Sequence, residues 1–291
     1  KGVIMTYAQF LDMLEQEICL LAEEEEHIHR VRVLKNNGVK MDGFSCCVRG
    51  RKEQPTVYVN HYYYEGIHRG EIRKLAQQIL KVQRESLLEK GNDLLQVLEY
   101  EKMKERIYYR LISRERNEEL LRDVPHLFWL DLAVVFYLKI PEEIIRSATA
   151  LIHNSHMKQW GIDLKELYHI AAENMAEIPV MLEPMEQLLE GYGLEGKTSG
   201  MYVLGIRERE YGAAVMLNPD VLRRCFRQIG EEFYVLPSSI HEVILLPVSY
   251  SGNPAELEAL VKEVNETCVT PEDYLSGHVY RYFSDTGELK I

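Results

Sequence analysis

The first ninety residues alternate between helical and strand-like patterns. Apolar residues recur at helical spacing from Tyr7 to Leu21, and Thr6 with Gln9 forms a capping box in front of them. Three strand-like runs separated by glycine-containing turns follow, near residues 29–35, 43–49 and 55–60. A second helical pattern extends from about Glu71 to Leu88. This order predicts a helix, a three-stranded antiparallel meander and a second helix.

The middle of the chain, from about residue 100 to 195, alternates strands and helices. Its clearest strand is Leu132 to Ile140, because an almost unbroken apolar run is typical of a strand buried on both faces. Asp163 and Glu166 form an acidic analogue of a capping box and predict a helix that Pro179 stops. Shorter elements are expected as strands near 107–112 and 148–152 and as a helix near 117–121.

The last hundred residues combine helix starts with further strand-like runs. Three pairs of a capping residue and a proline predict helix starts, at Asn218-Pro219, Asn253-Pro254 and Thr270-Pro271. Strand-like runs lie near 201–206, 212–217, 232–236, 241–247 and 278–283. Strands and helices mix without a strict βαβ rhythm, which predicts an α+β fold of mixed, mostly antiparallel strands with flanking helices. Two lobes are expected, residues 5–98 and 99–291, with a single domain as the alternative.

Composition and charge narrow the classes of function. The chain has 291 residues, 46% of them hydrophobic, and its 34 basic and 46 acidic residues give a net charge of −12. Such an acidic surface repels phosphate backbones and disfavours nucleic-acid binding. Lys1 to Ile4 precede Met5, a candidate natural start, and no apolar run predicts a membrane span or a secretion signal. The five cysteines, with Cys46 and Cys47 adjacent, predict reduced thiols and a cytoplasmic protein.

One literal motif match points to nucleotide phosphates. Gly191, Gly196, Lys197 and Thr198 fit the phosphate-loop pattern G-x-x-x-x-G-K-[ST]. A phosphate loop runs from a buried strand into a helix, whose N-terminus faces the phosphates. Here a helix-like segment precedes the match, a strand-like segment follows it, and Glu195 adds a negative charge. The order favours a glycine-rich connection from helix to strand, and we predict no cofactor.

A second partial motif lies near the C-terminus. His241-Glu242 resembles the start of the zinc-protease pattern H-E-x-x-H, but Leu245 occupies the position of the second histidine. The segment is rich in valine, isoleucine and leucine and is predicted as a strand, on which His241 and Glu242 face opposite sides. We therefore interpret His241 as a hydrogen-bonded structural residue and predict no metal site.

A third group supplies acid–base candidates. His153 and His156 follow a predicted strand, and Asp131 precedes the buried strand. A carboxylate and an imidazole could serve as general base and orienter, or as metal ligands. With His241 and Glu242 in a cleft between two halves, these residues suggest a small-molecule or peptide hydrolase. Separate structural roles for the same residues remain the alternative.

The aromatic composition supports a different class of function. The chain has 18 tyrosines but only 7 phenylalanines, and Tyr62, Tyr63 and Tyr64 are consecutive. Tyrosine offers both apolar area and a hydroxyl group, so it is frequent in contact surfaces. Our primary hypothesis is a binding or interaction module with a protein partner or a second copy of the chain, and the hydrolase is the alternative.

Several segments resemble known families of bacterial proteins. The marks are Asn36-Asn37-Gly38-Val39, the run from Pro55 to Asn60, Val124-Pro125-His126 with Leu130 to Val135, and the run from Leu236 to Val243. These residues resemble the family called domain of unknown function 5688. The stretch from Trp160 through Glu166 to Asn174, followed by Ala213 to Pro219, is less closely similar to a second unassigned bacterial family. The resemblance implies an intracellular bacterial protein and supplies no activity, cofactor or catalytic residue.

Overall fold

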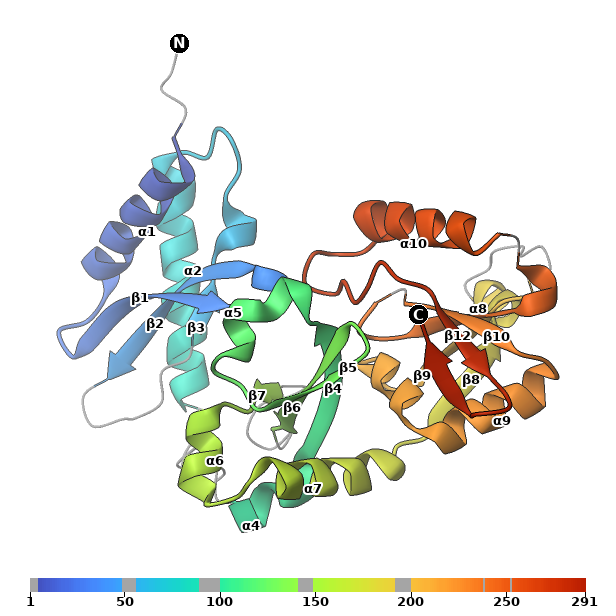
Figure 1. Cartoon of the computed structure of the whole chain (residues 1–291). Helices are drawn as coiled ribbons and strands as arrows, with labels where there is room; N and C mark the ends of the chain where they lie inside the picture. The colour runs from blue at the N-terminus through green and yellow to red at the C-terminus, as the bar shows by residue number, and fades with distance from the viewer. Residues whose placement is uncertain are drawn as a thin grey trace. The chain divides into compact units, whose positions relative to one another are not determined.

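The structure is a computed structural model that describes residues 5–48, 56–88, 100–140, 149–191, 200–237, 239–251 and 253–291. The chain forms two compact units, shown in Figure 1. Unit 1 comprises Lys1–Lys35 and Val39–Glu99, and unit 2 comprises Asn36–Gly38 and Tyr100–Ile291. The division of the chain into domains at residues 5–98 and 99–291 stays a prediction.

Unit 1 combines two helices with a three-stranded antiparallel meander. Its elements are α1 (Tyr7–Leu21), β1 (Glu26–Leu34), β2 (Lys40–Val48), β3 (Thr56–Tyr58), the short 3-10 helix η2 (Asn60–Tyr62) and α2 (Arg69–Leu88). The capping box at Thr6 is present, since its hydroxyl accepts from the Gln9 amide. The predicted order of helix, meander and helix is confirmed.

The core of unit 1 lies between its helices and its sheet. Helices α1 and α2 lie side by side (Figure 1) and bury Phe10, Leu14 and Ile72 completely. From the sheet, Phe44 of the central strand joins the same cluster. Burying side chains of this size contributes about 1.5–3 kcal/mol each, so the apolar faces of the two helices account for the packing of this unit.

The first half of unit 2 contains a four-stranded antiparallel sheet. Its elements are η1 (Asn36–Gly38), α4 (Tyr100–Met103), η3 (Lys104–Arg106), β4 (Ile107–Ser113), η4 (Glu115–Asn117), α5 (Glu118–Leu121), β5 (His126–Trp129), β6 (Leu132–Lys139), β7 (Thr149–Leu151), α6 (Asn154–Trp160) and α7 (Leu164–Ala176). Strand β6 pairs with the other three, and all its residues except Lys139 are buried. The prediction of a strand buried on both faces is confirmed.

The second half of unit 2 contains a six-stranded sheet in the order β13-β12-β10-β11-β9-β8. Its elements are β8 (Val180–Pro184), α8 (Met185–Gly191), β9 (Tyr202–Ile206), η5 (Gly212–Leu217), α9 (Pro219–Ile229), β10 (Phe233–Leu236), β11 (Val243–Pro247), η6 (Val248–Tyr250), α10 (Pro254–Cys268), β12 (Tyr280–Phe283) and β13 (Glu288–Lys290). Figure 1 shows α10 and α9 on opposite sides of this sheet. The predicted α+β fold with antiparallel strands and flanking helices is confirmed.

Two predictions about the last hundred residues are wrong. Residues 212–217 form the 3-10 helix η5 rather than a strand, because a short buried apolar run is compatible with either conformation. Thr270-Pro271 begins a turn rather than a helix: the Thr270 hydroxyl donates to Asp273, and the amides of Asp273 and Tyr274 donate to the Thr270 carbonyl. The prolines after Asn218 and Asn253 do occupy helix starts.

Among the helices that the structure describes, none is both long enough and apolar enough to cross a membrane.

Strands β5, β8 and β13 are absent from the prediction, since runs of three to five residues carry little periodicity. Strand β8 matters most, because it supplies one wall of the candidate site described next.

Candidate functional site

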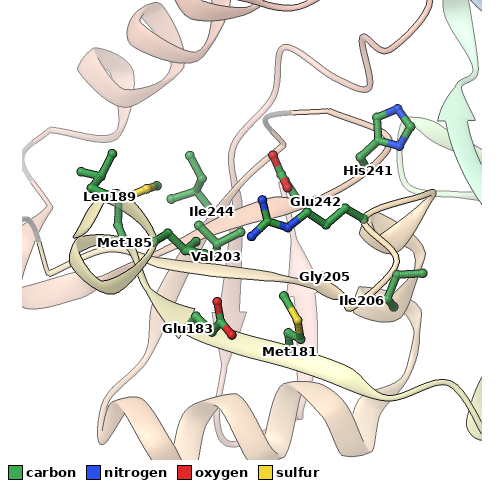
Figure 2. Close-up of a pocket in the computed structure, with 12 residues that line it drawn as sticks. Met181, Glu183, Met185, Leu189, Val203, Gly205, Ile206, His241, Glu242 and Ile244 are labelled. Carbon is green, nitrogen blue, oxygen red and sulfur yellow. The ribbon is translucent and has the colours of Figure 1, made fainter. Parts of the chain in front are cut away.

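A pocket of about 320 Å³ lies in unit 2 beside strands β8, β9 and β11. Its size falls at the lower end of the range of roughly 300–1,000 Å³ that is usual for small-molecule sites. The apolar side chains that line it are Met181, Met185, Leu188, Leu189, Val203, Ile206 and Ile244. Figure 2 shows the side chains of α8 and of the three strands converging on this space.

The register of the three strands explains which side chains line the pocket. Glu183 of β8 and Ile244 of β11 both pair with Val203 of β9, so these three form one row across the sheet. Met181 pairs with Gly205, which lies two residues after Val203 and therefore on the same face. Most strand residues of the lining thus share one face of the sheet, and α8, which begins directly after β8, covers one end of the pocket.

Gly205 provides the space for the pocket. A Cβ atom built there would lie 3.5 Å from the Glu242 Cβ and from the His241 carbonyl oxygen, which is ordinary van der Waals contact. A larger side chain would therefore be accommodated by the backbone and would extend into the pocket. Because Gly205 stands opposite Met181 in the register and has no side chain, it leaves space in the pocket beside Met181.

The loop that leads away from β9 has a strained backbone. Arg209 lines the pocket with a φ of 54°, and Tyr211 has a φ of 59°. Residues other than glycine adopt this left-handed conformation at a cost of about 1–3 kcal/mol, and such residues concentrate at functional sites. Gly212 follows, where a Cβ would lie 2.5 Å from the His241 carbonyl oxygen. The tight approach at Gly212 fixes the loop against the residues that precede β11.

His241 lies at the rim of the pocket with both ring nitrogens engaged. Its Nδ1 accepts from the Tyr211 amide at 3.2 Å, which places the hydrogen on Nε2, and Nε2 is 3.1 Å from Asp273 Oδ1. The ring also stacks on Tyr211 with centroids 5.7 Å apart. In this arrangement the imidazole is neutral, and neither nitrogen offers a lone pair to a metal ion or a substrate proton.

Three charged side chains line the pocket: Glu183, Arg209 and Glu242. Arg209 and Glu242 each have an interaction partner. Glu183 differs, because within the described part of the chain its carboxylate has no hydrogen bond or ion pair. Figure 2 shows Glu183 and Glu242 with their carboxylates on opposite sides of the pocket, and His241 apart from the aliphatic side chains. An unpaired carboxylate against apolar walls is the distinctive chemical feature of this site.

The predicted histidine group is divided between two places. Asp131 accepts hydrogen bonds from the hydroxyls of Ser276 at 2.6 Å and Tyr280 at 2.8 Å. His153 instead meets Asp123, with Nδ1 and Oδ2 2.7 Å apart, and its amide donates to His156 Nδ1. The structure therefore joins His153 with His156 and with Asp123, a carboxylate that was not among the predicted site residues.

The environment of His156 opposes a charged role. Burial lowers its pKa below the ordinary value, and the neighbouring His153 adds to this effect. Its ring stacks near Trp160 with centroids 5.8 Å apart.

His241 and Glu242 directly precede β11 instead of lying within it, because the strand begins at Val243. The observed strand thus begins two residues later than the predicted strand over residues 241–247.

The phosphate-loop match falls mostly outside the described residues, since Gly196, Lys197 and Thr198 lie in the stretch 192–199. Its flanks are described: α8 ends at Gly191 before it, and β9 starts at Tyr202 after it. The order is therefore helix to strand, opposite to that of a phosphate loop. No group of three or more histidine, cysteine, aspartate or glutamate residues within the described ranges could hold a metal ion.

The tyrosine run of unit 1 divides between core and surface. Tyr63 packs against Tyr7 and Phe10, and its hydroxyl donates to the Met5 carbonyl. Tyr62 and Tyr64 are exposed, although the Tyr64 hydroxyl donates to Glu71. Of the three consecutive rings, these two are the most exposed, and the partner interface stays a prediction.

Several site residues were not selected from the sequence. Met181 and Glu183 belong to β8, which was not predicted, and Met185 begins the helix α8 that follows it. The available signal was the alternation Met181, Leu182, Glu183 after the helix-stopping Pro179, which places an acidic residue on the face of an apolar one. Asp273 and Tyr211 had no local signal, because they meet His241 only through the fold.

Comparison with known proteins assigns the chain to a family. The model of the family of unknown function DUF5688 matches residues 7–284, so the chain belongs to this family over nearly its whole length. Neither the curated proteins nor the solved structures give a match. The resemblance inferred from the sequence is thus confirmed, and it assigns no activity to any residue.

Proposed function

We propose that this member of the DUF5688 family is a binding module and that the pocket of unit 2 is its ligand site. The observation that carries the proposal is a ligand-sized, mostly aliphatic pocket that contains an unpaired carboxylate. Two of its wall residues are methionines, whose flexible thioether side chains adapt to ligands of varied shape. The strained backbone at Arg209 adds support, because such strain concentrates where a site is held in a fixed geometry.

The hydrolase alternative has less support from the same geometry. A general base needs a free lone pair within hydrogen-bond reach of the substrate proton. The lone pair of His241 already accepts from Tyr211, and Asp131 accepts from two hydroxyls. His153 pairs with Asp123, which is exposed. The binding module therefore remains the function that the site supports best.

The finer parts of the hypothesis are proposals as well. The five cysteines are free thiols, which supports a cytoplasmic location, where thiols stay reduced. Tyr62 and Tyr64 are the surface that we propose for a protein partner or a second copy of the chain.

A series of straight-chain alcohols tests the ligand site. Titration calorimetry with 1-butanol, 1-pentanol and 1-hexanol should show affinity rising about fourfold with each methylene, the equivalent of ~0.8 kcal/mol. Gly205→Val should abolish the binding, because its side chain would occupy the pocket. Gly205→Ala is the matched control, since a Cβ at this position makes only ordinary contacts and should leave binding largely intact. Binding that Gly205→Val does not change would place the alcohols elsewhere and overturn the proposal.

A further inference from the structure

We propose that the pocket selects aliphatic primary amines and that Glu183 is the counter-ion of the ammonium group. This inference rests on the proposed function, since it names the chemical class of the ligand for the same pocket. It follows from three properties of the lining: its net charge, its unpaired carboxylate and its lack of aromatic rings.

The charge of the lining favours a cation. Two carboxylates, Glu183 and Glu242, face one guanidinium, Arg209, and His241 is neutral because its Nδ1 accepts from the Tyr211 amide. The lining that the structure describes therefore carries one net negative charge. A carboxylate ligand would meet this charge at close range beside mostly aliphatic side chains, where repulsion is screened less than in bulk water. An ammonium group would neutralise it.

The individual partners identify Glu183 as the binding residue. Arg209 and Glu242 already have interactions, whereas the Glu183 carboxylate has none among the described residues. A carboxylate accepts hydrogen bonds only, and an ammonium group offers up to three donors. Charge-assisted hydrogen bonds of this kind are about twice as strong as neutral ones. Glu183 also shares its row with Val203 and Ile244, so a head group bound to it places the attached chain against aliphatic side chains.

The side chains that line the pocket favour a primary over a quaternary ammonium group. Quaternary ammonium ions are usually recognised by cages of aromatic rings. The lining of this pocket contains no phenylalanine, tyrosine or tryptophan among the described residues, and its imidazole, His241, is engaged by Tyr211 and Asp273. Recognition here must use N–H donors directed to a carboxylate. A primary ammonium supplies them, whereas a trimethylammonium group does not.

Four probes of equal chain length test the inference by titration calorimetry at pH 7. They are hexylamine, which is protonated at this pH, 1-hexanol, hexanoate and hexyltrimethylammonium. Hexylamine should bind about tenfold more tightly than hexanol, the effect of one charge-assisted contact. Hexanoate should bind most weakly, and hexyltrimethylammonium should not exceed hexanol.

Two variants complete the test on the full chain. Glu183→Gln should lower the affinity for hexylamine about tenfold, so that its preference over hexanol is lost. Glu266→Gln is the control, because it makes the same change of charge at an exposed position outside the pocket lining. Equal binding of hexylamine and hexanol to the wild type, or a preference that survives in Glu183→Gln, would overturn the inference and leave the binding module in place. Failure of both probes to bind would instead remove the proposed ligand site.

Discussion

Two carboxylates, Asp42 in unit 1 and Glu183 in unit 2, sit on sheet strands in opposite circumstances. The Asp42 side chain is only 4% exposed and fully paired: Arg32 donates to both of its oxygens, and the Tyr7 hydroxyl donates to one of them. Its amide is also bonded to Asn60. Glu183 lines an apolar pocket and has no partner in the part of the chain that the structure describes.

The pairing is visible in the ionisation of the Asp42 cluster. Burial alone would raise the pKa of Asp42, but hydrogen bonds from Arg32 and Tyr7 and the charges of Arg32 and Arg30 outweigh it and hold the pKa below its ordinary value. Burial and the adjacent carboxylate raise the pKa of Tyr7 to about 12. The comparison teaches that a carboxylate with a complete set of donors stabilises its own fold, whereas one without donors is available to a ligand.

The largest effect on stability is expected at Asp42, whose carboxylate has a complete set of hydrogen-bond donors. Asp42→Ala should lower the free energy of unfolding by about 3 kcal/mol, because hydrogen bonds to a charged group contribute roughly 1.5–3 kcal/mol each and the freed Arg32 regains water. Asp12→Ala removes the exposed partner of Arg30 and should change stability by less than about 0.5 kcal/mol. Urea unfolding measures both. Equal losses would contradict the distinction between a buried and an exposed pair.

Acid should remove most of the same contribution. Because the folded-state pKa of Asp42 is lowered, its stabilisation is present above the unfolded pKa of about 4 and is lost as the pH falls through the folded value. The difference in unfolding free energy between wild type and Asp42→Asn should therefore be largest near neutral pH and shrink below about pH 4. Urea midpoints from neutral to acidic pH measure this difference. A pH-independent difference would show that charge pairing is not its source.

A medium effect on stability is expected for His241, which lines the pocket and is also hydrogen-bonded within the fold. His241→Phe keeps a ring beside Tyr211 but loses both hydrogen bonds, which should reduce stability by about 1–2 kcal/mol. His169→Phe is the control, since that histidine is exposed and its ion pair is with the neighbouring Glu173. Thermal unfolding compares the two. If His241→Phe were as harmless as His169→Phe, the structural interpretation of His241 would fail.

The smallest effect is expected at Glu183. In the ligand-free protein, Glu183→Gln should change the free energy of unfolding by less than about 0.5 kcal/mol, because no contact among the described residues is lost. The matched substitution Asp42→Asn should be clearly destabilising. A loss of stability at Glu183 as large as that at Asp42 would indicate that the pocket carboxylate is a structural residue.

The same comparison shows how far the sequence predicts the molecule. The helices and meander of unit 1 follow from local signals, the capping box at Thr6 and the alternation of apolar runs with glycine turns. Local signals also predict β6, because a continuous apolar run is long enough to identify. They fail for residues 212–217, because a short buried apolar run is compatible with either conformation and here forms a 3-10 helix.

The candidate site was less predictable for a physical reason. The pocket joins three strands whose register is set by the whole sheet, and the sequence analysis selected only His241 and Glu242 among its residues. The bond of His241 to Asp273 spans 32 residues, and no spacing rule anticipates it. Asp131 and His153 were predicted to share a site because of their chemistry, but Asp131 accepts from Ser276 and His153 pairs with Asp123.

Methyl NMR of the ten methionines tests the central claim most directly. Met181 and Met185 line the pocket, while methionines elsewhere, such as Met103 in its buried position, provide internal references. Titration with hexylamine should shift the Met181 and Met185 methyl signals with one common saturation curve and leave Met103 unchanged, and Gly205→Val should remove the response. Saturable binding that moves other methionines but neither of these two would contradict the account.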